Sequence, residues 1–342
     1  MVLYLGVREE GGGMRSGSTI KDVAREAGCS PSLVSLFLRN PGTTRVAEET
    51  KKRISRSVEK LNYRRNMLAS ILKSGSSNVI GVLVDAQTNP PIHRLIACLE
   101  REAAERGCRL QLGLFHNSLD SLWESYSTLK QYGAAGVICL SHDYPEFNCE
   151  LEARFTGIGD VVFFNGPERP GHPCVISDLE SGMGMAFRRL REHGRRRIGL
   201  CVPGNGPAWD GILRRISAFK FLSGDDSLIC PVPREIPLRQ AMEQTLFPFI
   251  ERQRPDALFM SNDRFALCAA GLLKARGMNI PENMALVGFD NDPADVDVVP
   301  SLSSIAVDNR LAARKLFDLL GSEKSGTEIF RLPPELFIRE SC

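Results

Sequence analysis

Short strand-like runs alternate with longer helical patterns between residues 79 and 320. The strand-like segments are 79–84, 109–115, 135–140, 160–165, 197–202, 256–260 and 284–289. The helical segments are 92–106, 119–132, 179–192, 209–222, 238–253, 264–276 and 309–320. Strands that are joined through helices run parallel, and the helices cover both faces of the sheet. The pattern therefore predicts an α/β region of two lobes, built from parallel sheets with helices on both faces.

Polar side chains follow several of these predicted strands. Asp85 and Asn89 follow the first strand, Asn262 and Asp263 follow 256–260, and Asp290 follows 284–289. Ligands of open parallel sheets bind beyond the carboxyl ends of the strands, so these residues are candidates for a small-molecule site. Asp263 is an equally good candidate for the N-cap of the helix that follows it. The GNGP sequence at 204–207 lacks the spacing of a phosphate-binding glycine loop, which argues against nucleotide binding.

A different pattern precedes this region. Residues 19–40 predict two short helices joined by a tight turn. Thr19 and Asp22 have the spacing of an N-terminal cap, and Gly28 suits the left-handed end of the first helix. Ser30 is expected to cap the second helix, with Pro31 at its first position. The residues left on the outer face of the second helix are Pro31, Ser32, Ser35 and Leu36. A second helix with a free outer face can enter a DNA major groove, although a helical hairpin in another core stays an alternative.

Further helices and charge support contact with DNA. A third helix is predicted over 47–61 with basic residues on its outer side, and a short fourth helix is predicted over 66–73 before a flexible SGSSN joint. Residues 1–75 carry 14 Lys and Arg against 7 Asp and Glu, whereas the rest of the chain carries 29 against 34. A basic segment on a mildly acidic body suits contact with phosphates, although a solvated basic surface would have the same composition.

Other classes of protein receive little support. No apolar run approaches the ~18 residues of a membrane span, and residues 1–17 are too acidic for a signal peptide, so we expect a disordered leader, with Met14 as an alternative start. The ten cysteines include no C-x-x-C pair, and the five histidines have no partner in a nucleophile motif. We therefore expect a cytoplasmic, reduced protein without a metal, a cofactor or catalytic residues. A redox-active cysteine remains an alternative.

Several motifs resemble one family in order and spacing. They are TIKDVAREAGCSPSLVS from residue 19, VAEETKKRI from 46, LNYRRNMLASILKSGSSNVIGVLV from 61, RRISAF from 214, PDALFMSNDRFAL from 255 and ENMALVGFDN from 282. They are similar to the lactose-repressor/galactose-repressor (LacI/GalR) family of bacterial transcription regulators, from about residue 19 to residue 341. The resemblance implies an all-α helix-turn-helix head and a periplasmic-binding-protein-like effector domain of two lobes. It also implies a homodimer on a palindromic operator, controlled by a small molecule that is a sugar by family default.

The resemblance also implies site residues. Contacts to DNA are expected from Thr19, Ser30, Pro31, Ser32, Ser35, Leu36, Asn66, Ala69, Leu72 and Lys73. Contacts to the effector are expected from Asn89, Arg215, Asn262 and Asp290. Leu72 matches the leucine that the family wedges between base pairs in the minor groove. Two positions depart from the family: Leu36 replaces a usual polar residue, and Ser70 stands where arginine is common. The aromatic residue that stacks on the effector is not identifiable, and Trp209 or Phe265 are substitutes.

The expected organisation is a leader over 1–17, a helix-turn-helix domain over 18–64, a hinge helix and linker over 65–78 and an effector-binding and dimerisation domain over 79–342. The N-lobe is expected at 79–175 and 306–322 and the C-lobe at 176–305 and 327–341, with crossings near 175–178, 305–308 and 322–327. Two rival functions are a solute-binding protein of the same two-lobe shape and an α/β sugar-metabolising enzyme. The effector itself is open between a sugar, a nucleobase, another metabolite and none at all.

Overall fold

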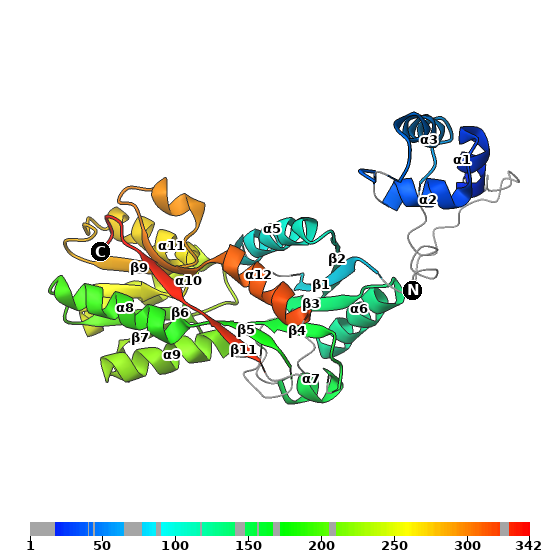
Figure 1. The fold of residues 1–342 in the computed structure, drawn as a ribbon. Coiled ribbons are helices and arrows are strands. Elements are labelled where there is room, and N and C mark those ends of the chain that lie inside the picture. Colours follow the sequence, from blue (N-terminus) through cyan, green and yellow to red (C-terminus); the bar gives the residue numbers. More distant parts are fainter. Residues whose placement is uncertain are drawn as a thin grey trace, which may run out of the picture. The chain divides into compact units, whose positions relative to one another are not determined.

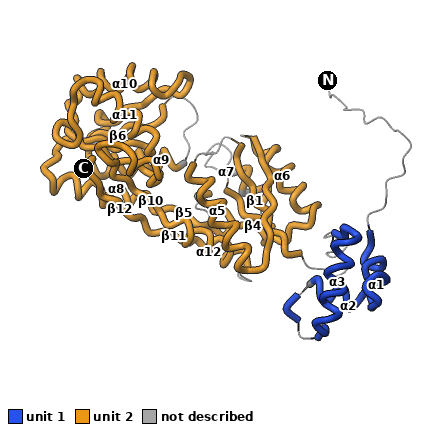
Figure 2. The backbone as a smooth tube through the Cα atoms, turned by 90° about the horizontal axis from the view of Figure 1, so that it is seen from above, with its two compact units in different colours: residues 1–76 blue, residues 77–342 orange. Residues whose placement is uncertain are grey.

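The computed structural model describes residues 18–39, 41–43, 45–64, 77–86, 90–116, 118–140, 148–155, 157–166, 172–204, 210–321 and 328–342. The chain divides into two compact units, Met1–Ser76 and Ser77–Cys342, which Figure 2 colours separately. The predicted leader and the predicted hinge helix lie outside the described residues, and so do Asn66, Ala69, Leu72 and Lys73.

The first unit holds the helix-turn-helix. Its helices are α1 (Ile20–Ala27), α2 (Pro31–Arg39) and α3 (Glu48–Lys60). Thr19 and Asp22 form the predicted cap of α1, because the Asp22 carboxylate accepts from the Thr19 backbone N at 2.9 Å and the Thr19 hydroxyl accepts from the Asp22 N at 3.4 Å. Gly28 ends α1 with a φ of 60°, as predicted. Ser30 caps α2, since its hydroxyl accepts from the Leu33 N at 3.2 Å.

A small apolar core holds these helices together. It is formed by Val23, Ala24, Ala27, Val34, Phe37, Val46 and Ile54. At its edge, the Ser18 hydroxyl donates to the Leu61 carbonyl at 2.7 Å. The Lys60 ammonium group lies 2.6 Å from the Glu26 carboxylate and links α3 to α1. The core and these ties fix the position of α2 within the head.

The second unit begins with an N-lobe around a six-stranded parallel sheet, sheet A, in the order β11-β5-β4-β3-β1-β2. Its strands are β1 (Val79–Asp85), β2 (Arg109–Phe115), β3 (Gly136–Leu140), β4 (Val161–Phe164), β5 (Cys174–Ser177) and β11 (Ile329–Leu332). Helices α5 (Pro90–Glu105) and α12 (Asn309–Leu320) pack on one face. Helices α6 (Leu119–Gln131) and α7 (Asn148–Phe155) pack on the other.

The C-lobe repeats this plan around sheet B, in the order β12-β10-β9-β8-β6-β7. Figure 1 labels strands β6, β7 and β9 of this sheet. Its strands are β6 (Ile198–Pro203), β7 (Ile229–Val232), β8 (Ala257–Met260), β9 (Ala285–Phe289), β10 (Ser303–Val307) and β12 (Pro334–Phe337). Helices α10 (Leu238–Gln253) and α11 (Asp263–Ala275) cover one face, and α8 (Leu179–Glu192) and α9 (Asp210–Ser223) cover the other. Two 3₁₀ turns, Asp226–Leu228 and Pro293–Val296, complete it. The predicted fold class, a helical head with an α/β domain of two lobes, is confirmed.

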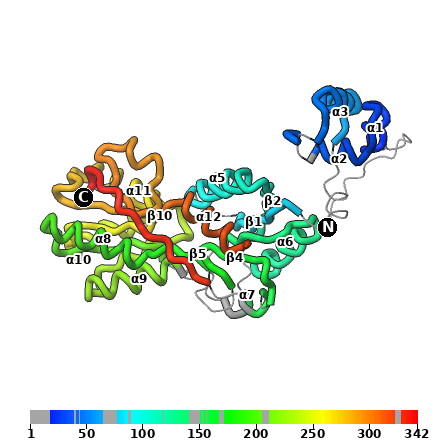
Figure 3. The backbone as a smooth tube through the Cα atoms, viewed as in Figure 1, coloured from blue at the N-terminus to red at the C-terminus, as the bar shows by residue number. Residues whose placement is uncertain are grey.

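Three passages of the chain join the lobes. The first leads from β5 into α8, and the second leads from β10 into α12. The third differs from the prediction, because β11 pairs in parallel with β5 in sheet A while β12 pairs antiparallel with β10 in sheet B. The chain therefore crosses at Pro333 rather than within 322–327, and Ile329–Leu332 belongs to the N-lobe. Figure 3 shows this red end of the chain running along both lobes.

Candidate functional site

The outer face of α2 is the first candidate site. Pro31 and Ser32 are exposed, and Ser35 is half-buried. Leu36 is also half-buried and packs against the core of the head, so its side chain is partly turned inward. Thr19 and Ser30 are exposed, but each hydroxyl is already engaged in capping a helix. The free polar groups on this face are few, which leaves base contacts to a small number of side chains.

Helix α3 adds exposed basic side chains to the head. Lys52, Arg53 and Arg56 are exposed. Lys51 differs, because its ammonium group lies 2.6 Å from the Glu48 carboxylate one turn earlier. Exposed Lys and Arg side chains beside a helix-turn-helix contact phosphates and set the register of the protein on DNA without reading sequence.

The second candidate site is a cavity of about 540 Å³ between the N-lobe and the C-lobe. It lies where the carboxyl ends of strands from both sheets meet, which is the position expected for a ligand site in parallel sheets. The polar and charged side chains on its wall are Asp85, Asn165, Ser177, Asp178, Arg214, Arg215, Arg234, Ser261, Asn262, Arg264, Asp290 and Asn309. Phe164, Phe265 and Phe289 add apolar surface. This mixture of aromatic surface and convergent polar groups is typical of a small-molecule site.

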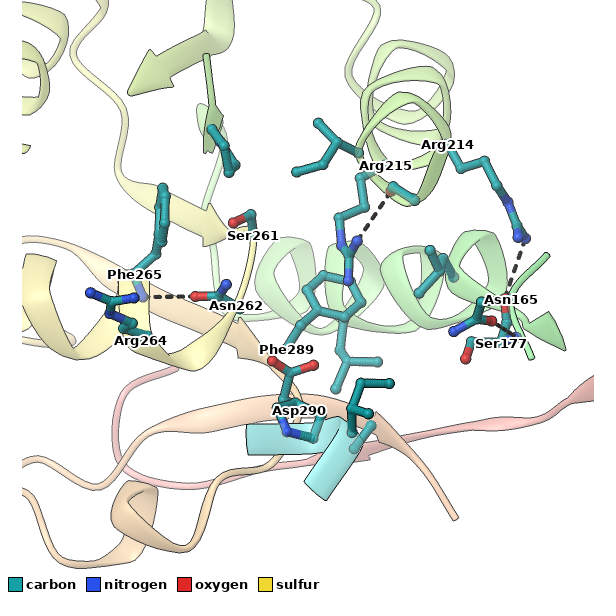
Figure 4. A pocket seen from close by; sticks show the side chains of 18 of the residues that line it. Asn165, Ser177, Arg214, Arg215, Ser261, Asn262, Arg264, Phe265, Phe289 and Asp290 are labelled. Atoms are coloured by element: carbon teal, nitrogen blue, oxygen red, sulfur yellow. Dashed lines mark hydrogen bonds between the residues drawn. The ribbon is translucent and has the colours of Figure 1, made fainter. Parts of the chain in front are cut away.

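Arg215 extends from α9 across the middle of the C-lobe wall (Figure 4). Its guanidinium group lies 4.6 Å from the centre of the Phe289 ring, and its Nη1 donates to the Gly211 carbonyl at 3.1 Å. The stacked ring and the hydrogen bond fix the plane of the guanidinium group. The adjacent Arg214 turns away, with its Nε and Nη2 within 3.1 Å of the Glu180 carboxylate. Of these two adjacent arginines, Arg214 is paired with a carboxylate, whereas Arg215 stacks on a ring of the cavity wall.

Asn262 serves the structure as well as the cavity. Its Oδ1 accepts from the Phe265 N at 3.0 Å, so this residue caps α11. The amide oxygen is thereby engaged and the NH₂ group is left to act as a donor. Asp263, the cap expected from the sequence, is instead the first residue of α11. Its buried carboxylate accepts from the Ser304 hydroxyl at 2.7 Å and from the Asp292 N at 2.8 Å. Asp263 thus supports the loop behind the cavity and is absent from its wall.

Asp290 lies at the carboxyl end of β9 with an unusual backbone. Its φ is 108°, and its N donates to the Ile305 carbonyl at 2.8 Å. Burial raises the pKa of its carboxyl group to about 7, against the opposing effect of the Arg215 and Arg94 guanidinium groups. Near neutral pH this group can therefore accept hydrogen bonds when ionised and donate one when protonated.

Arg94 joins the two lobes beside the cavity. It lies on α5 of the N-lobe, and its Nη2 donates to the Asp290 carbonyl at 2.7 Å. Its Nη1 lies 3.0 Å from the Asp292 carboxylate, and both side chains are 28% exposed. A single N-lobe side chain thus holds the C-lobe loop that carries Asp290, which gives a direct link between cavity and N-lobe.

Several residues on the cavity wall were not anticipated. Asn165 adopts a φ of 51°, and its Oδ1 accepts from the Ser177 N at 2.8 Å. Ser261 is 4% exposed, and its hydroxyl has no hydrogen-bond partner among the described residues. Arg234 and Arg264 are two further wall residues that the sequence did not predict. Asn165 and Ser261 directly follow strands, which is a usable signal, whereas Arg234 follows β7, a strand that was not predicted. Asn89 and Trp209 lie outside the described residues, and Phe265 lies on the wall.

The described ranges contain no group of three His, Cys, Asp or Glu side chains placed to hold a metal ion. Likewise, none of the helices described is both long and apolar enough to cross a membrane.

Known proteins match both parts of the chain. Residues 19–66 match the family model "Bacterial regulatory proteins, lacI family", and residues 187–342 match the model "Periplasmic binding protein-like domain". The HTH-type transcriptional repressor PurR of Pasteurella multocida (strain Pm70) is 27% identical over 340 residues, which cover 95% of this chain and 98% of PurR.

Solved structures share the fold. A Lac repressor dimer bound to operator and the anti-inducer ONPF is 21% identical, with a TM-score of 0.78 over 95% of this chain and 98% of that one. The transcriptional regulator CelR in complex with cellobiose is 22% identical, with a TM-score of 0.64 over 95% and 100% of the two chains. The head and the two-lobe domain both match known proteins, and PurR matches nearly the whole length of the chain. The chain joins a DNA-binding head that matches the lacI family of bacterial regulatory proteins to a periplasmic-binding-protein-like domain.

Proposed function

We propose that this chain is a DNA-binding transcriptional repressor that binds a palindromic operator as a homodimer. A small polar molecule in the cavity between the lobes controls its affinity for DNA. One observation carries this proposal: a basic helix-turn-helix head and a cavity lined by polar groups from both lobes occur in the same chain. The known relatives support it, because PurR is a transcriptional repressor and the Lac repressor dimer binds an operator.

The head has separate groups for binding and for reading DNA. Exposed basic residues on α3 would contact phosphates, while Pro31, Ser32 and Ser35 on α2 would face base edges. Leu36 is placed to touch a thymine methyl group with the part of its side chain that is exposed. By family resemblance, Asn66, Ala69, Leu72 and Lys73 would bind the minor groove, with Leu72 as the wedge that bends DNA.

The cavity favours a ligand with several oxygen atoms. The Arg215 fork can donate to a pair of oxygens, and the Asn262 NH₂ group adds further donors. Ionised Asp290 can accept from two hydroxyl groups. Phe164, Phe265 and Phe289 suit the apolar face of a sugar or a nucleobase. Sugars are the family default, and CelR binds cellobiose, so a sugar is the first class to test.

Control of DNA binding would follow from the two-lobe design. A ligand that contacts both walls favours the arrangement of the lobes in which those contacts form. The N-lobe begins at β1, directly after the segment that leads from the head. A change in the position of this lobe in each protomer would alter the spacing of the two heads and hence operator affinity. We also propose a cytoplasmic location, where a DNA-binding protein meets its operator.

The test combines DNA selection with a ligand screen. Genomic fragments recovered on the purified protein at moderate salt should contain a common palindrome. A panel of sugars, nucleobases and other metabolites should include a compound that raises the melting temperature and changes affinity for that palindrome. Recovery of no sequence-specific fragment, together with a strong ligand response, would favour the solute-binding alternative. Chemical turnover of the ligand would favour the enzyme.

A further inference from the structure

Two cysteines of the C-lobe lie side by side on neighbouring strands. Cys201 on β6 and Cys230 on β7 are register partners in a parallel pairing. Partners in adjacent parallel strands point to the same face, with Cα atoms about 4.8 Å apart. That spacing lies within the range of roughly 4.4–6.8 Å that a disulfide bond requires. No other two cysteines are register partners in the strand pairings that the structure describes.

The two thiols lie side by side inside the core. Both are buried under α10 and α11 on one face of sheet B. The Cys201 thiol lowers the pKa of the Cys230 thiol, and the Thr245 side chain on α10 and the Arg252 charge act in the same direction. The Cys230 thiol and burial raise the pKa of Cys201. The pair is therefore asymmetric, with Cys230 as the better nucleophile and Cys201 as the proton donor.

We propose that Cys201 and Cys230 are a reversible oxidation site that forms a disulfide bond between β6 and β7. With a peroxide as oxidant, the Cys230 thiolate attacks one peroxide oxygen, the O–O bond breaks and a sulfenic acid forms. The Cys201 sulfur then attacks the Cys230 sulfur, the S–O bond breaks and the S–S bond forms. The two thiol protons leave in water, so each disulfide consumes one peroxide and yields two waters when the peroxide is hydrogen peroxide.

The position of this site connects it to the cavity. Strands β6 and β7 lead directly to Pro203 and Arg234 on the cavity wall. The Gly204 N donates to the Val232 carbonyl at 2.7 Å, so the two strand ends are closely joined there. Strand β7 is the last strand of sheet B, and separation of this edge would admit a small oxidant. A disulfide two residues before Pro203 and three residues before Pro233 would fix the wall that these two strand ends form.

The experiment needs neither operator nor effector. The reduced full-length protein is treated with hydrogen peroxide, remaining thiols are alkylated under denaturing conditions, and peptides are identified by mass spectrometry. We expect a cross-linked peptide pair containing Cys201 and Cys230, lighter by two hydrogen atoms and restored by dithiothreitol. These two thiols should be lost about tenfold faster than those of Cys139 and Cys174, which are equally buried but belong to sheet A.

Matched variants separate the two roles. Cys201→Ser should leave Cys230 as a sulfenic acid that dimedone traps, and Cys230→Ser should leave Cys201 reduced. Melting curves of the reduced variants check that each still folds. The proposal is overturned if Cys201 and Cys230 are both still reduced, and therefore alkylated on denaturation, when Cys139 and Cys174 have reacted, or if they pair only after denaturation. It is also overturned if Cys230→Ser does not protect Cys201.

Discussion

The N-lobe and the C-lobe share a scaffold but contribute differently to the cavity between them. Each has a six-stranded sheet whose order places the late strand from the carboxyl-terminal segment, β11 or β12, at one edge. Yet the C-lobe wall carries charged groups such as Arg215, Arg264 and Asp290, whereas the N-lobe wall combines Asp85, Asn165 and Ser177 with the apolar Pro91, Ile92 and Phe164. The repeated plan supplies the location of a site, and the residues at the strand ends decide which lobe supplies most of its polar contacts.

A buried acidic network explains part of this difference. Behind the C-lobe wall, Asp263 holds Ser304 and the backbone of Asp292, and Arg339 lies 3.8 Å from buried Asp295. Burial raises the pKa of Asp263 to about 9. The C-lobe therefore holds its binding loop through costly buried polar groups that must stay paired. Apolar clusters cover both faces of the sheet in each lobe, so this acidic network adds to the apolar core of the C-lobe and does not replace it.

The largest expected effect contrasts one glycine in each sheet. A Cβ at Gly288 on β9 would lie 2.0 Å from Asp263 Oδ1, which Ser304 holds in place. Gly288→Ala should lower the free energy of unfolding by about 3–5 kcal/mol, measured by urea denaturation. In the N-lobe, Gly136→Ala meets the flexible end of Leu320 at 2.9 Å and should cost about 1 kcal/mol. Equal decreases in the free energy of unfolding for Gly288→Ala and Gly136→Ala would show that the acidic network around Asp263 is not rigid.

Removing the central arginine of the C-lobe wall should have the next largest effect. Arg215→Ala should weaken binding of the ligand found in the screen by about 2 kcal/mol, or roughly 30-fold, because it removes a charge-assisted pair of hydrogen bonds. Isothermal titration calorimetry measures this change. Arg188→Ala is the control, since Arg188 is exposed on α8 and absent from the cavity wall. Similar affinities for Arg215→Ala and Arg188→Ala would remove Arg215 from the site.

Removal of Arg94, which links the two lobes, should weaken ligand binding less than removal of Arg215. It should mainly reduce the effect of the ligand on operator affinity. Arg94→Ala removes the bonds to Asp290 and Asp292, which are partly exposed to solvent, so ligand affinity should fall by about 1 kcal/mol. The effect of the ligand on operator affinity should shrink as well, as measured by fluorescence anisotropy of labelled DNA. Arg101→Ala, on the exposed side of α5, controls for loss of a basic residue. An unchanged ligand effect on DNA would exclude Arg94 as the connection.

A pH series gives the smallest expected effect. The pKa of Asp290 is raised to about 7 in the folded protein, so its protonated form is favoured by folding. Its contribution to stability is complete below its unfolded pKa of about 4 and is lost as the pH rises through 7. Asp290→Asn should therefore gain about 1–2 kcal/mol relative to the wild type between pH 5 and pH 8, measured by thermal unfolding without ligand. A pH-independent difference would contradict this pKa.

The long helices could be predicted from the sequence, whereas several of the short elements could not. Helices α8, α10 and α12 have the predicted bounds because each presents a long apolar stripe. The prediction omitted β5, β7, β10, β11, β12 and α7, which have four to eight residues. Pairing in the sheet, rather than an alternating pattern, stabilises strands as short as Ile329–Leu332. Omission of this strand explains why the third crossing was misplaced.

The candidate site also has a part that the sequence predicted and a part that it could not predict. Arg215, Asn262 and Asp290 are on the cavity wall, as a site beyond the strand ends requires. The sequence could not show that Asn262 rather than Asp263 caps α11, because either side chain has the chemistry of a cap. Nor could it show that Arg94 reaches Asp290, a contact between residues far apart in the chain that depends on how the lobes meet.

The most direct test of this account is operator affinity measured with and without the ligand, in the wild type and in Arg215→Ala. We expect saturating ligand to change the dissociation constant of the wild-type dimer for its palindrome by about tenfold or more. Arg215→Ala should bind the palindrome as tightly as the unliganded wild type, and about 30-fold more ligand should be needed for the same response. An equal response in both proteins, or none in the wild type, would contradict control of the head through the cavity.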